Sequence, residues 1–389
     1  MTRFSLALAL RRLPQFESDG LRVAVTSALY SLALGIASVA IPLQAIAVGY
    51  GAVEVGLLVA TSAVSQMITR VFLGSMMRLL PDWVIVAAAC ALLASSCLAV
   101  VITSAAVVFV ASQLMQGISR ACFWTGSQTH VVRGEGSSVR ALASINLVGN
   151  IGLLAGPVVA GLLIGDDGRL ALVVATAAAL VALASARHLN RLPPFKRLAT
   201  RPPGHLWQRP GVREGCHAGV TAGAWRALLG SYVPLALVEA DQSALVIGSL
   251  VTVANGAALL GAWLVRGLED EVRIRSTLRL CTPLTGLALA TTGPLAFSAT
   301  LAGLALTASG VAAGALQTLG PAFAADAVHR EERGEAIAVT GTFRAASLFV
   351  APLATAAMVA VLPVAAAMAL TGALMAVPIR RHGRREPVA

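Results

Sequence analysis

Residues 140–161 read RALASINLVGNIGLLAGPVVAG, and residues 335–356 read EAIAVTGTFRAASLFVAPLATA. Both segments follow a basic stretch, and Ala141 aligns with Ala336 as Pro157 aligns with Pro352, at one offset of 195 residues (336 − 141 and 352 − 157). Because this offset is close to half of the 389 residues, the match predicts two related halves that run in the same direction. A chance likeness between two Ala-rich helices is the alternative.

The composition of the whole chain indicates whether it meets water or lipid. Hydrophobic residues make up 57% of the chain and charged residues 12%, with a mean hydropathy of +0.80. Soluble domains have about 45–50% apolar and about 25% charged residues. The continuously apolar segments lack the alternation of barrel strands, and about 20 such residues form a helix that crosses a bilayer. We therefore expect an all-α membrane protein with about twelve transmembrane helices in two six-helix pseudo-repeats. The expected spans are 23–48, 54–74, 83–104, 106–129, 140–164, 169–187, 214–238, 243–266, 277–296, 298–325, 335–361 and 363–379.

The arginines predict the orientation in the membrane. They precede the first span and occupy every second connection after it, while the opposite connections contain only Arg169 among basic residues. By the positive-inside rule both termini are cytoplasmic, in a multi-pass protein of the cell (inner) membrane. The net charge of +11 thus reflects topology and does not indicate nucleic-acid binding. The basic segment MTRFSLALALRRL, residues 1–13, predicts a helix lying on the membrane surface.

The basic, Pro-rich stretch before residue 214 separates the two predicted halves. The expected organisation is a cytoplasmic N-terminal segment (1–22), a first six-helix bundle (23–187), a cytoplasmic linker (188–213), a second six-helix bundle (214–379) and a cytoplasmic tail (380–389). Five cysteines are scattered without paired spacing, so neither a disulfide framework, a metal site nor a cofactor is expected.

The fifth span carries Gly152, Gly156, Pro157 and Gly161. This pattern resembles the g-x-x-x-G-P-x-x-G-G signature of drug exporters and antiporters in the major facilitator superfamily, and the resemblance covers essentially the whole chain. It implies a monomeric secondary transporter in the lipid bilayer, with a small-molecule site between two halves. The small residues allow close helix packing, and the proline bends the helix. Plain close packing is the alternative to a role in conformational change.

Two regions depart from that resemblance, one after the second span and one in the fourth span. After the second span the family usually has G-x-x-x-D-R-x-G-R-R/K, whose charges hold one conformation. Here Gly74 is kept, Arg78 occupies the position of the Asp and Pro81 replaces the second Gly. We expect this gate to be absent or rebuilt. Proton-coupled exporters often carry an Arg where this chain has Gln113, so their proton relay is not carried over.

Arg120 lies about nine residues, or roughly 14 Å, from the cytoplasmic end of the fourth span. A buried Arg costs about 2.5–3.5 kcal/mol on insertion scales, so it should face protein or water. One polar stripe is predicted by residues that recur at helical spacing, namely Gln113, Gln116, Arg120, Trp124 and Ser127. In the superfamily the first, fourth, seventh and tenth spans line the cavity, which implies that Arg120 and Arg226 face it. The candidate cavity residues are Tyr30, Gln113, Gln116, Arg120, Trp124, Asn146, Asn150, Arg226, Asn255, Gln317 and Arg344.

No Asp or Glu lies deep in an expected span, so the deep arginines have no obvious ion-pair partner there. We expect at least one to bind an anionic group of the substrate, since a guanidinium matches carboxylate and phosphate. The alternative is that they brace helices, or that Arg344 reaches the cytoplasmic surface. The favoured function is an efflux permease for a small organic molecule. An organic-anion importer or exchanger is the alternative; an enzyme or a sensor is disfavoured because no catalytic cluster or added domain is seen.

Overall fold

The computed structural model describes residues 18–134, 136–163, 169–196 and 204–377. Every regular element in these ranges is a helix. The surface helix expected at 1–13, most of the segment expected at 1–22 and the tail expected at 380–389 lie outside the described residues.

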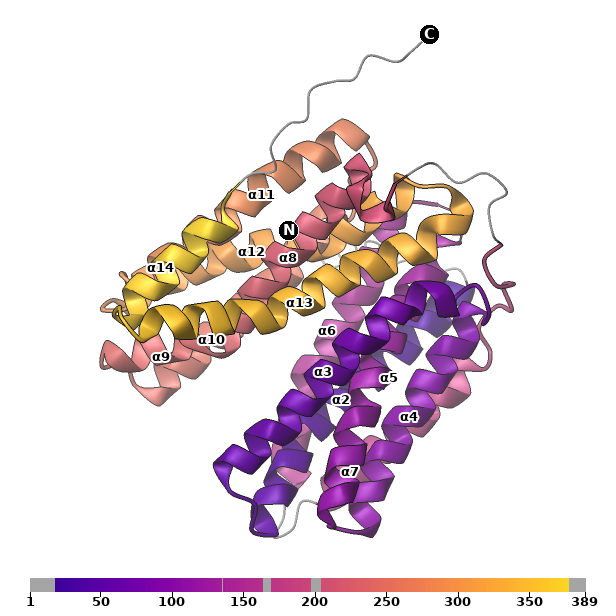
Figure 1. The fold of residues 1–389 in the computed structure, drawn as a ribbon, viewed down its shortest axis with the longest axis horizontal. Coiled ribbons are helices and arrows are strands. Elements are labelled where there is room, and N and C mark those ends of the chain that lie inside the picture. The colour runs from indigo at the N-terminus through magenta and orange to yellow at the C-terminus, as the bar shows by residue number, and fades with distance from the viewer. Residues whose placement is uncertain (1–17, 135, 164–168, 197–203, 378–389) are drawn as a thin grey trace, which may run out of the picture. The chain divides into compact units, whose positions relative to one another are not determined.

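The described elements follow one another as helices joined by short connections (Figure 1). The first half contains α2 (Ser18–Ala47), α3 (Ala52–Met76), α4 (Asp82–Ile102), α5 (Ala106–Val132), α6 (Ser138–Leu163) and α7 (Arg169–Ala186). The second half contains η1 (Leu206–Gln208), α8 (Pro210–Gly230), α9 (Tyr232–Glu239), α10 (Ala244–Val265), α11 (Glu271–Thr292), α12 (Ala299–Asp326), η2 (Arg330–Glu332), α13 (Arg333–Val359) and α14 (Val364–Met375).

Eight of the described helices are long and apolar enough to cross a membrane, and α14 is a shorter apolar helix. The all-α membrane fold is therefore confirmed, while the count of twelve spans remains a prediction. α11 illustrates why some helices are not apolar enough along their whole length to count among these eight. Its first half contains Glu271, Arg273, Arg275 and Arg279, as expected for the end of a helix that reaches water.

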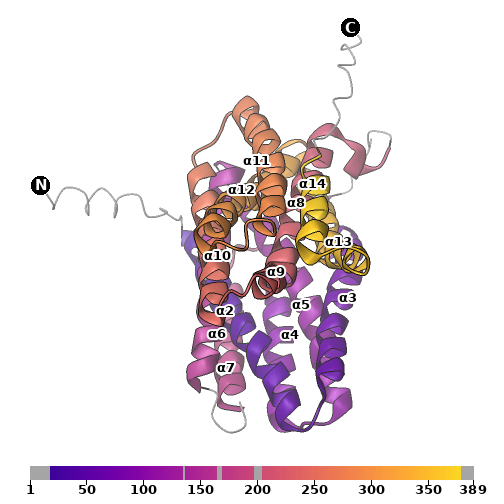
Figure 2. The ribbon, with the colours of Figure 1, turned by 90° about the vertical axis from the view of Figure 1, so that its left-hand side faces the viewer.

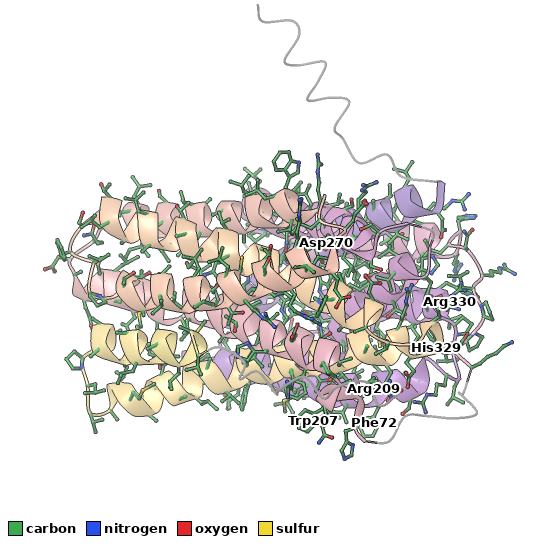
Figure 3. The ribbon with its side chains drawn as sticks, turned by 90° about the horizontal axis from the view of Figure 1, so that it is seen from above. Phe72, Trp207, Arg209, Asp270, His329 and Arg330 are labelled. Carbon is green, nitrogen blue, oxygen red and sulfur yellow. The ribbon has the colours of Figure 1, made fainter. Side chains whose placement is uncertain are left out.

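Side-chain caps mark where several helices of the second half begin. Asp270 precedes α11, and its carboxylate accepts from the backbone N–H of Arg273 at 3.0 Å (Figure 3). The Ser243 hydroxyl accepts from Val246 N–H in the same way at the start of α10, at 3.4 Å. Each cap satisfies a backbone donor that the first turn of a helix leaves unpaired.

The single span expected at 214–238 is divided into two helices. α8 ends at Gly230, and Ser231 adopts φ −126° and ψ −74°, outside the helical region, before α9 begins at Tyr232. Pro234 explains the break, because a proline ring clashes with the carbonyl four residues earlier, here that of Gly230. The Ser231 hydroxyl donates to the Ala227 carbonyl at 2.8 Å and thereby satisfies one acceptor at the end of α8.

The chain forms two compact units. Unit 1 comprises Met1–Pro202 with His329–Ala338, and unit 2 comprises Pro203–Val328 with Val339–Ala389. Residues 188–196, expected in the linker, group with unit 1, whereas α8 groups with unit 2. The first residues of α13 also group with unit 1, although the rest of that helix belongs to unit 2.

Within unit 1, α2 packs against α6 and α7, α5 packs against α3 and α4, and α4 packs against α7. These six helices lie roughly alongside one another (Figure 2). Within unit 2, α12 packs against α8, α10 and α11, and α11 packs against α14. α2, α4 and α5 thus each pack against two neighbouring helices of unit 1.

Candidate functional site

α5 contacts three neighbouring helices, one of them, α3, through a face separate from the other two. Gly117 faces α3 so closely that a Cβ atom there would lie 1.9 Å from Ser65 Oγ. The Ser119 hydroxyl donates to the Ala89 carbonyl of α4 at 2.7 Å. Phe123 stacks on Tyr30 of α2, with ring centroids 3.6 Å apart and planes 4° from parallel. These contacts fix the rotation of α5 in unit 1.

The polar stripe of α5 lies between its α2 face and its α3 face. Gln113 and Gln116 are buried, whereas Arg120 and Trp124 are partly exposed. Arg120 Nη2 donates to Gln116 Oε1 at 3.4 Å, and Arg120 Nε has no hydrogen-bond partner. The structure therefore brings Gln116 and Arg120 together and leaves part of the guanidinium unpaired.

Trp124 extends the stripe toward α6. A Cβ atom on Gly149 would lie 2.9 Å from the Trp124 ring and 3.3 Å from Ser31 Oγ, so the glycine makes room for the indole. Asn146, one turn earlier on α6, is buried, and its Oδ1 lies 3.5 Å from Gln128 Nε2 of α5. Asn150 is partly exposed beside this contact.

Tyr30 is a packing residue. Its side chain is fully buried, its ring stacks on Phe123, and its hydroxyl shares a hydrogen bond of 2.8 Å with Ser119 Oγ. The hydroxyl, the one polar group of this side chain, is engaged in the contact between α2 and α5. Tyr30 was expected to line the cavity, but none of its side chain is exposed in this structure.

Arg70 of α3 is a further deep arginine that sequence reasoning missed. Only 8% of its surface is exposed, and its Nε atom has no hydrogen-bond partner. Gln66, one helical turn earlier, has its backbone N–H against Gly117 of α5, which places Arg70 level with residues 120–122. The signal was present in the sequence as a charged residue inside the expected span 54–74.

Unit 2 holds the other predicted arginines. The Arg226 guanidinium of α8 donates to Asn255 Oδ1 of α10, and Asn255 Nδ2 donates to the Val251 carbonyl at 2.8 Å. Arg344 of α13 packs beside Gly219 and Gly223 of α8 and is partly exposed. Gln317 of α12 is partly exposed as well. The structure thus joins Arg226 to Asn255 and leaves Gln317 on a different helix of the same unit.

Three of these arginines lack a carboxylate counter-charge in the part of the chain that the structure describes. The titratable group within electrostatic reach of Arg120 is the Tyr30 phenol, and for Arg70 it is the Cys122 thiol. Arg226 has neither kind of neighbour within reach. Phenol and thiol are neutral in such an apolar setting, so the residues that the structure describes do not compensate these guanidinium charges. No set of metal-ligating side chains occurs among the described residues.

The glycines of the fifth span differ in what they contact. Cβ atoms at Gly152 and Gly156 would lie 2.5 Å from the Ala28 carbonyl oxygen and from Gly35 Cα of α2, respectively. A Cβ atom at Gly161 would meet nothing within 4 Å. Pro157 lies inside α6. Gly152 and Gly156 thus set the distance between α6 and α2, and Gly161 does not.

The position expected to hold the family gate carries an ion pair of inverted sign. Arg78, after α3, pairs with Glu335 at the start of α13, and both residues belong to unit 1. A Cβ atom on Gly74 would lie 3.1 Å from Glu335 Cγ, so this glycine admits the glutamate. An ion pair therefore stands at this position, with the cation where the family places an anion, and its role as a gate remains a prediction.

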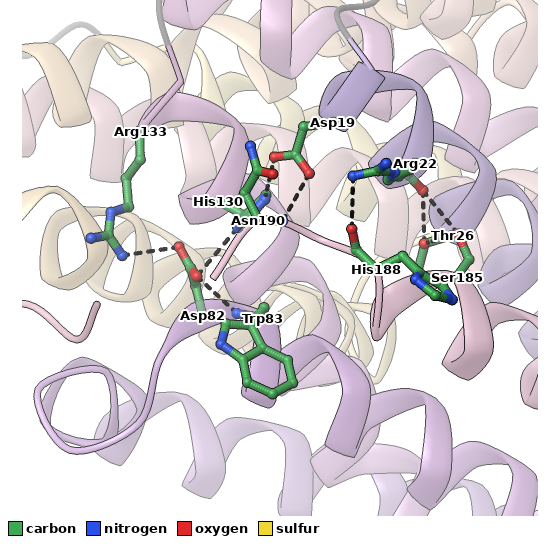
Figure 4. Close-up of polar contacts among 10 residues, drawn as sticks. All are labelled: Asp19, Arg22, Thr26, Asp82, Trp83, His130, Arg133, Ser185, His188 and Asn190. Carbon is green, nitrogen blue, oxygen red and sulfur yellow. Dashed lines mark hydrogen bonds and ion pairs between the residues drawn. The ribbon is translucent and has the colours of Figure 1, made fainter. Parts of the chain in front are cut away.

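A second charge cluster joins the ends of α2, α4 and α5 (Figure 4). His130 is 2% exposed; its Nε2 lies 2.9 Å from Asp19 Oδ2, and its Nδ1 lies 3.2 Å from Asp82 Oδ1, off the line of a hydrogen bond. Asp82 also pairs with Arg133 at 3.1 Å. Two carboxylates beside one imidazole ring favour its charged form. Asp19 further accepts from Asn190 N–H at 2.9 Å, which ties residues 188–190 to unit 1.

Comparisons with known proteins agree with this architecture. The sequence profile of the Major Facilitator Superfamily matches residues 23–352. Among solved structures, the human organic anion transporter MFSD10 (TETRAN) superimposes with a TM-score of 0.75 at 16% identity, covering 92% of this chain and 97% of that one. A bacterial homologue of the iron transporter ferroportin, in an outward-facing state with soaked iron, gives 0.72 at 13% identity, covering 92% and 98%.

FucP, a transporter of the same superfamily solved in the outward conformation, gives a TM-score of 0.71 at 13% identity, covering 92% of this chain and 96% of that one. Curated proteins offer no sequence match. At these identities the structural likeness establishes the fold and leaves the substrate to the chemistry of the site.

Proposed function

The chain belongs to the Major Facilitator Superfamily of transporters, and we propose that it exports a small organic anion across the cell membrane. In this proposal it acts as a monomer by alternating access, with both termini in the cytoplasm. Arg120 in unit 1 is the principal anion-binding group.

The observation that carries this proposal is that Arg120 and Arg226 lie within helix bundles with no carboxylate beside them among the described residues. Placing an ion in a medium of low dielectric constant costs several kcal/mol, and the cost falls when an opposite charge and hydrogen bonds accompany it. Arg120 has one long contact with Gln116 Oε1, and its Nε is unpaired. A bound carboxylate or phosphate supplies both the charge and the acceptors that this fork of N–H donors lacks.

Trp124 adds an apolar surface to the same stripe. Its indole lies against Gly149 and is partly exposed, one helical turn from Arg120. An anion with an apolar or aromatic body would place its charge on the guanidinium and its body on the indole. Arg226 and Asn255 form a second pair of groups in unit 2 that suits an anion or a polar substituent.

Export is favoured over uptake by the pattern Gly152, Gly156 and Pro157, which resembles the exporter signature of the family. The structure gives the two glycines a definite role, since each brings α6 to within backbone contact of α2. Among solved relatives of the fold, MFSD10 is described as an organic anion transporter. That description supports the anion class for this chain without fixing the direction.

The direct test is transport in inverted membrane vesicles, whose cytoplasmic face is outside. An exporter accumulates a labelled organic anion in these vesicles, and Arg120→Gln abolishes the accumulation while Arg187→Gln, on an exposed arginine, preserves it. Accumulation only in right-side-out vesicles would replace export by import. Accumulation that needs a second anion on the other side would identify an exchanger, and equal transport by Arg120→Gln would remove the assigned role of Arg120.

A further inference from the structure

Arg70 stands apart from the other deep arginines, and we propose that it is a second anion-binding site in unit 1, distinct from Arg120. The ligand is a small anionic group, either a free inorganic anion such as chloride or a second carboxylate on the transported molecule. The Arg70 site itself does not depend on the proposed function. Only the second source of its anion, a carboxylate on the transported molecule, rests on that function.

Burial and the lack of partners set Arg70 apart. Its exposed fraction is 8%, lower than that of the partly exposed Arg120, Arg226 and Arg344. Its Nε is without a hydrogen-bond partner, whereas Arg226 donates to Asn255. A guanidinium carries five N–H donors and cannot accept, so an acceptor must come from outside the described protein groups.

Within the described part of the chain, no carboxylate pairs with Arg70. The acid nearest along its own face is Glu335, which lies against Gly74, one helical turn from Arg70. Glu335 pairs with Arg78, and the titratable group that acts electrostatically on Arg70 is the Cys122 thiol instead. A buried cation beside a neutral thiol attracts a mobile anion, because charges interact more strongly where water is excluded.

Arg70 is also poorly placed to reach cytoplasmic water. It lies six residues before the last residue of α3, or about 9 Å along the helix axis. Side chains on a helix lean toward its N-terminus, which on the expected topology is the external end of α3. The guanidinium therefore leans into the membrane, where a snorkelling contact with the cytoplasmic surface is disfavoured.

The two arginines also differ in their surroundings at the same level of the unit. Arg120 belongs to the polar stripe with Gln116 and Trp124, and the titratable group near it is Tyr30. The group near Arg70 is Cys122, which is on a different face of α5 from the stripe. Two cationic groups with separate neighbours suit two anionic groups, and a single monoanion would leave one of them unpaired.

The first arm of the test uses inorganic anions alone. We expect the Tm of the purified protein to rise and saturate when gluconate is exchanged for chloride or bromide at constant ionic strength. Arg70→Gln should abolish this rise, and Arg120→Gln and Arg187→Gln should keep it. If Arg70→Gln does not fold, bromide soaked into crystals of the wild-type protein should give an anomalous peak at the Arg70 guanidinium.

The second arm compares succinate with butyrate as probes of charge number. If the anion at Arg70 is part of the transported molecule, succinate binds more tightly than butyrate, and Arg70→Gln removes a factor of about ten or more from succinate alone. No halide effect, no bromide peak and no preference for succinate would together overturn the Arg70 site. Binding of neither succinate nor butyrate, with an intact halide effect, would contradict the proposed function and leave the Arg70 site standing.

Discussion

Gly156→Ala is expected to destabilise unit 1 by separating two helices that meet backbone to backbone. A Cβ atom at residue 156 would lie 2.5 Å from Gly35 Cα, 2.6 Å from Gly35 C and 2.7 Å from Ile36 N. Ordinary contact begins at 3.4 Å, so α6 and α2 must move apart by about 0.9 Å (3.4 − 2.5). No flexible side chain can give way, because all three contacts are with backbone atoms.

The magnitude follows from two opposing contributions. Overpacking of this kind costs about 1–3 kcal/mol, and replacing Gly by Ala inside a helix returns about 0.8–1.0 kcal/mol of helix propensity. With rigid neighbours the first contribution lies near its upper end, so we expect a net loss of about 1–2 kcal/mol. In a bilayer no hydrophobic effect between helices offsets this loss of stability, since helix association there depends on close packing.

Gly161→Ala is the matched control on the same helix. Its new methyl group would meet nothing within 4 Å, so only the propensity gain applies and stability should equal or exceed that of the wild type. Both variants are compared by SDS titration in mixed micelles, followed by circular dichroism. Equal stability of the two alanine variants would refute the assignment of Gly156 as the close contact between α6 and α2.

Three further predictions concern charges and the helix break. Arg78→Glu should weaken the start of α13 on unit 1, and Arg78→Glu with Glu335→Arg should restore it, with a coupling of about 0.5–3 kcal/mol in a double-mutant cycle of thermal unfolding; additive effects would contradict the pair. His130→Gln should cost about 1–3 kcal/mol, because buried Asp82 keeps Arg133 but loses one of its two cationic neighbours, and partly exposed Asp19 loses its partner. His205→Gln, on an exposed histidine, should be silent in the same melting experiment. Pro234→Ala should allow α8 and α9 to merge into one helix. Spin labels at exposed Ser231 and Val238 would detect this as a change in the distance between them. An unchanged distance would mean that the helix breaks at Ser231 without the proline.

The helical architecture was predictable because the bilayer imposes it. A long apolar segment must satisfy its own backbone hydrogen bonds, so composition and length alone indicate helices. The same reasoning could not locate the break after Gly230. Pro234 was visible, yet prolines lie inside α2, α6, α11, α12 and α13 without ending them. Whether a proline bends or breaks a helix depends on neighbours that the sequence does not show.

The site was less accessible to sequence reasoning because the facing of each helix is a tertiary property. The stripe from Gln113 to Trp124 could be recognised by its spacing. Tyr30 could not be assigned in the same way, since its hydroxyl reaches Ser119, which lies 89 residues away in the chain. Arg78 was recognised as an exception, but its partner Glu335 lies 257 residues further on.

Arg70 could not be predicted as a candidate site for a different reason. The positive-inside rule uses the arginines of the connections to predict orientation, and it does not address an arginine inside a span. Only burial and the unpaired Nε distinguish Arg70 from a residue that reaches the surface. Substrate contact by the deep arginines named from the sequence remains a prediction.

The central claim, that Arg120 binds an anionic group of the substrate, is tested most directly by ligand-induced stabilisation of the purified protein. The Tm is measured against organic anions, lipophilic cations and neutral compounds, for the wild type and for Arg120→Gln. A ligand at about 100 times its Kd stabilises the folded state by about 2.7 kcal/mol. We predict that anions alone raise the Tm of the wild type and that folded Arg120→Gln loses this response. Stabilisation of both proteins to the same extent, or stabilisation by cations and neutral compounds only, would contradict the account.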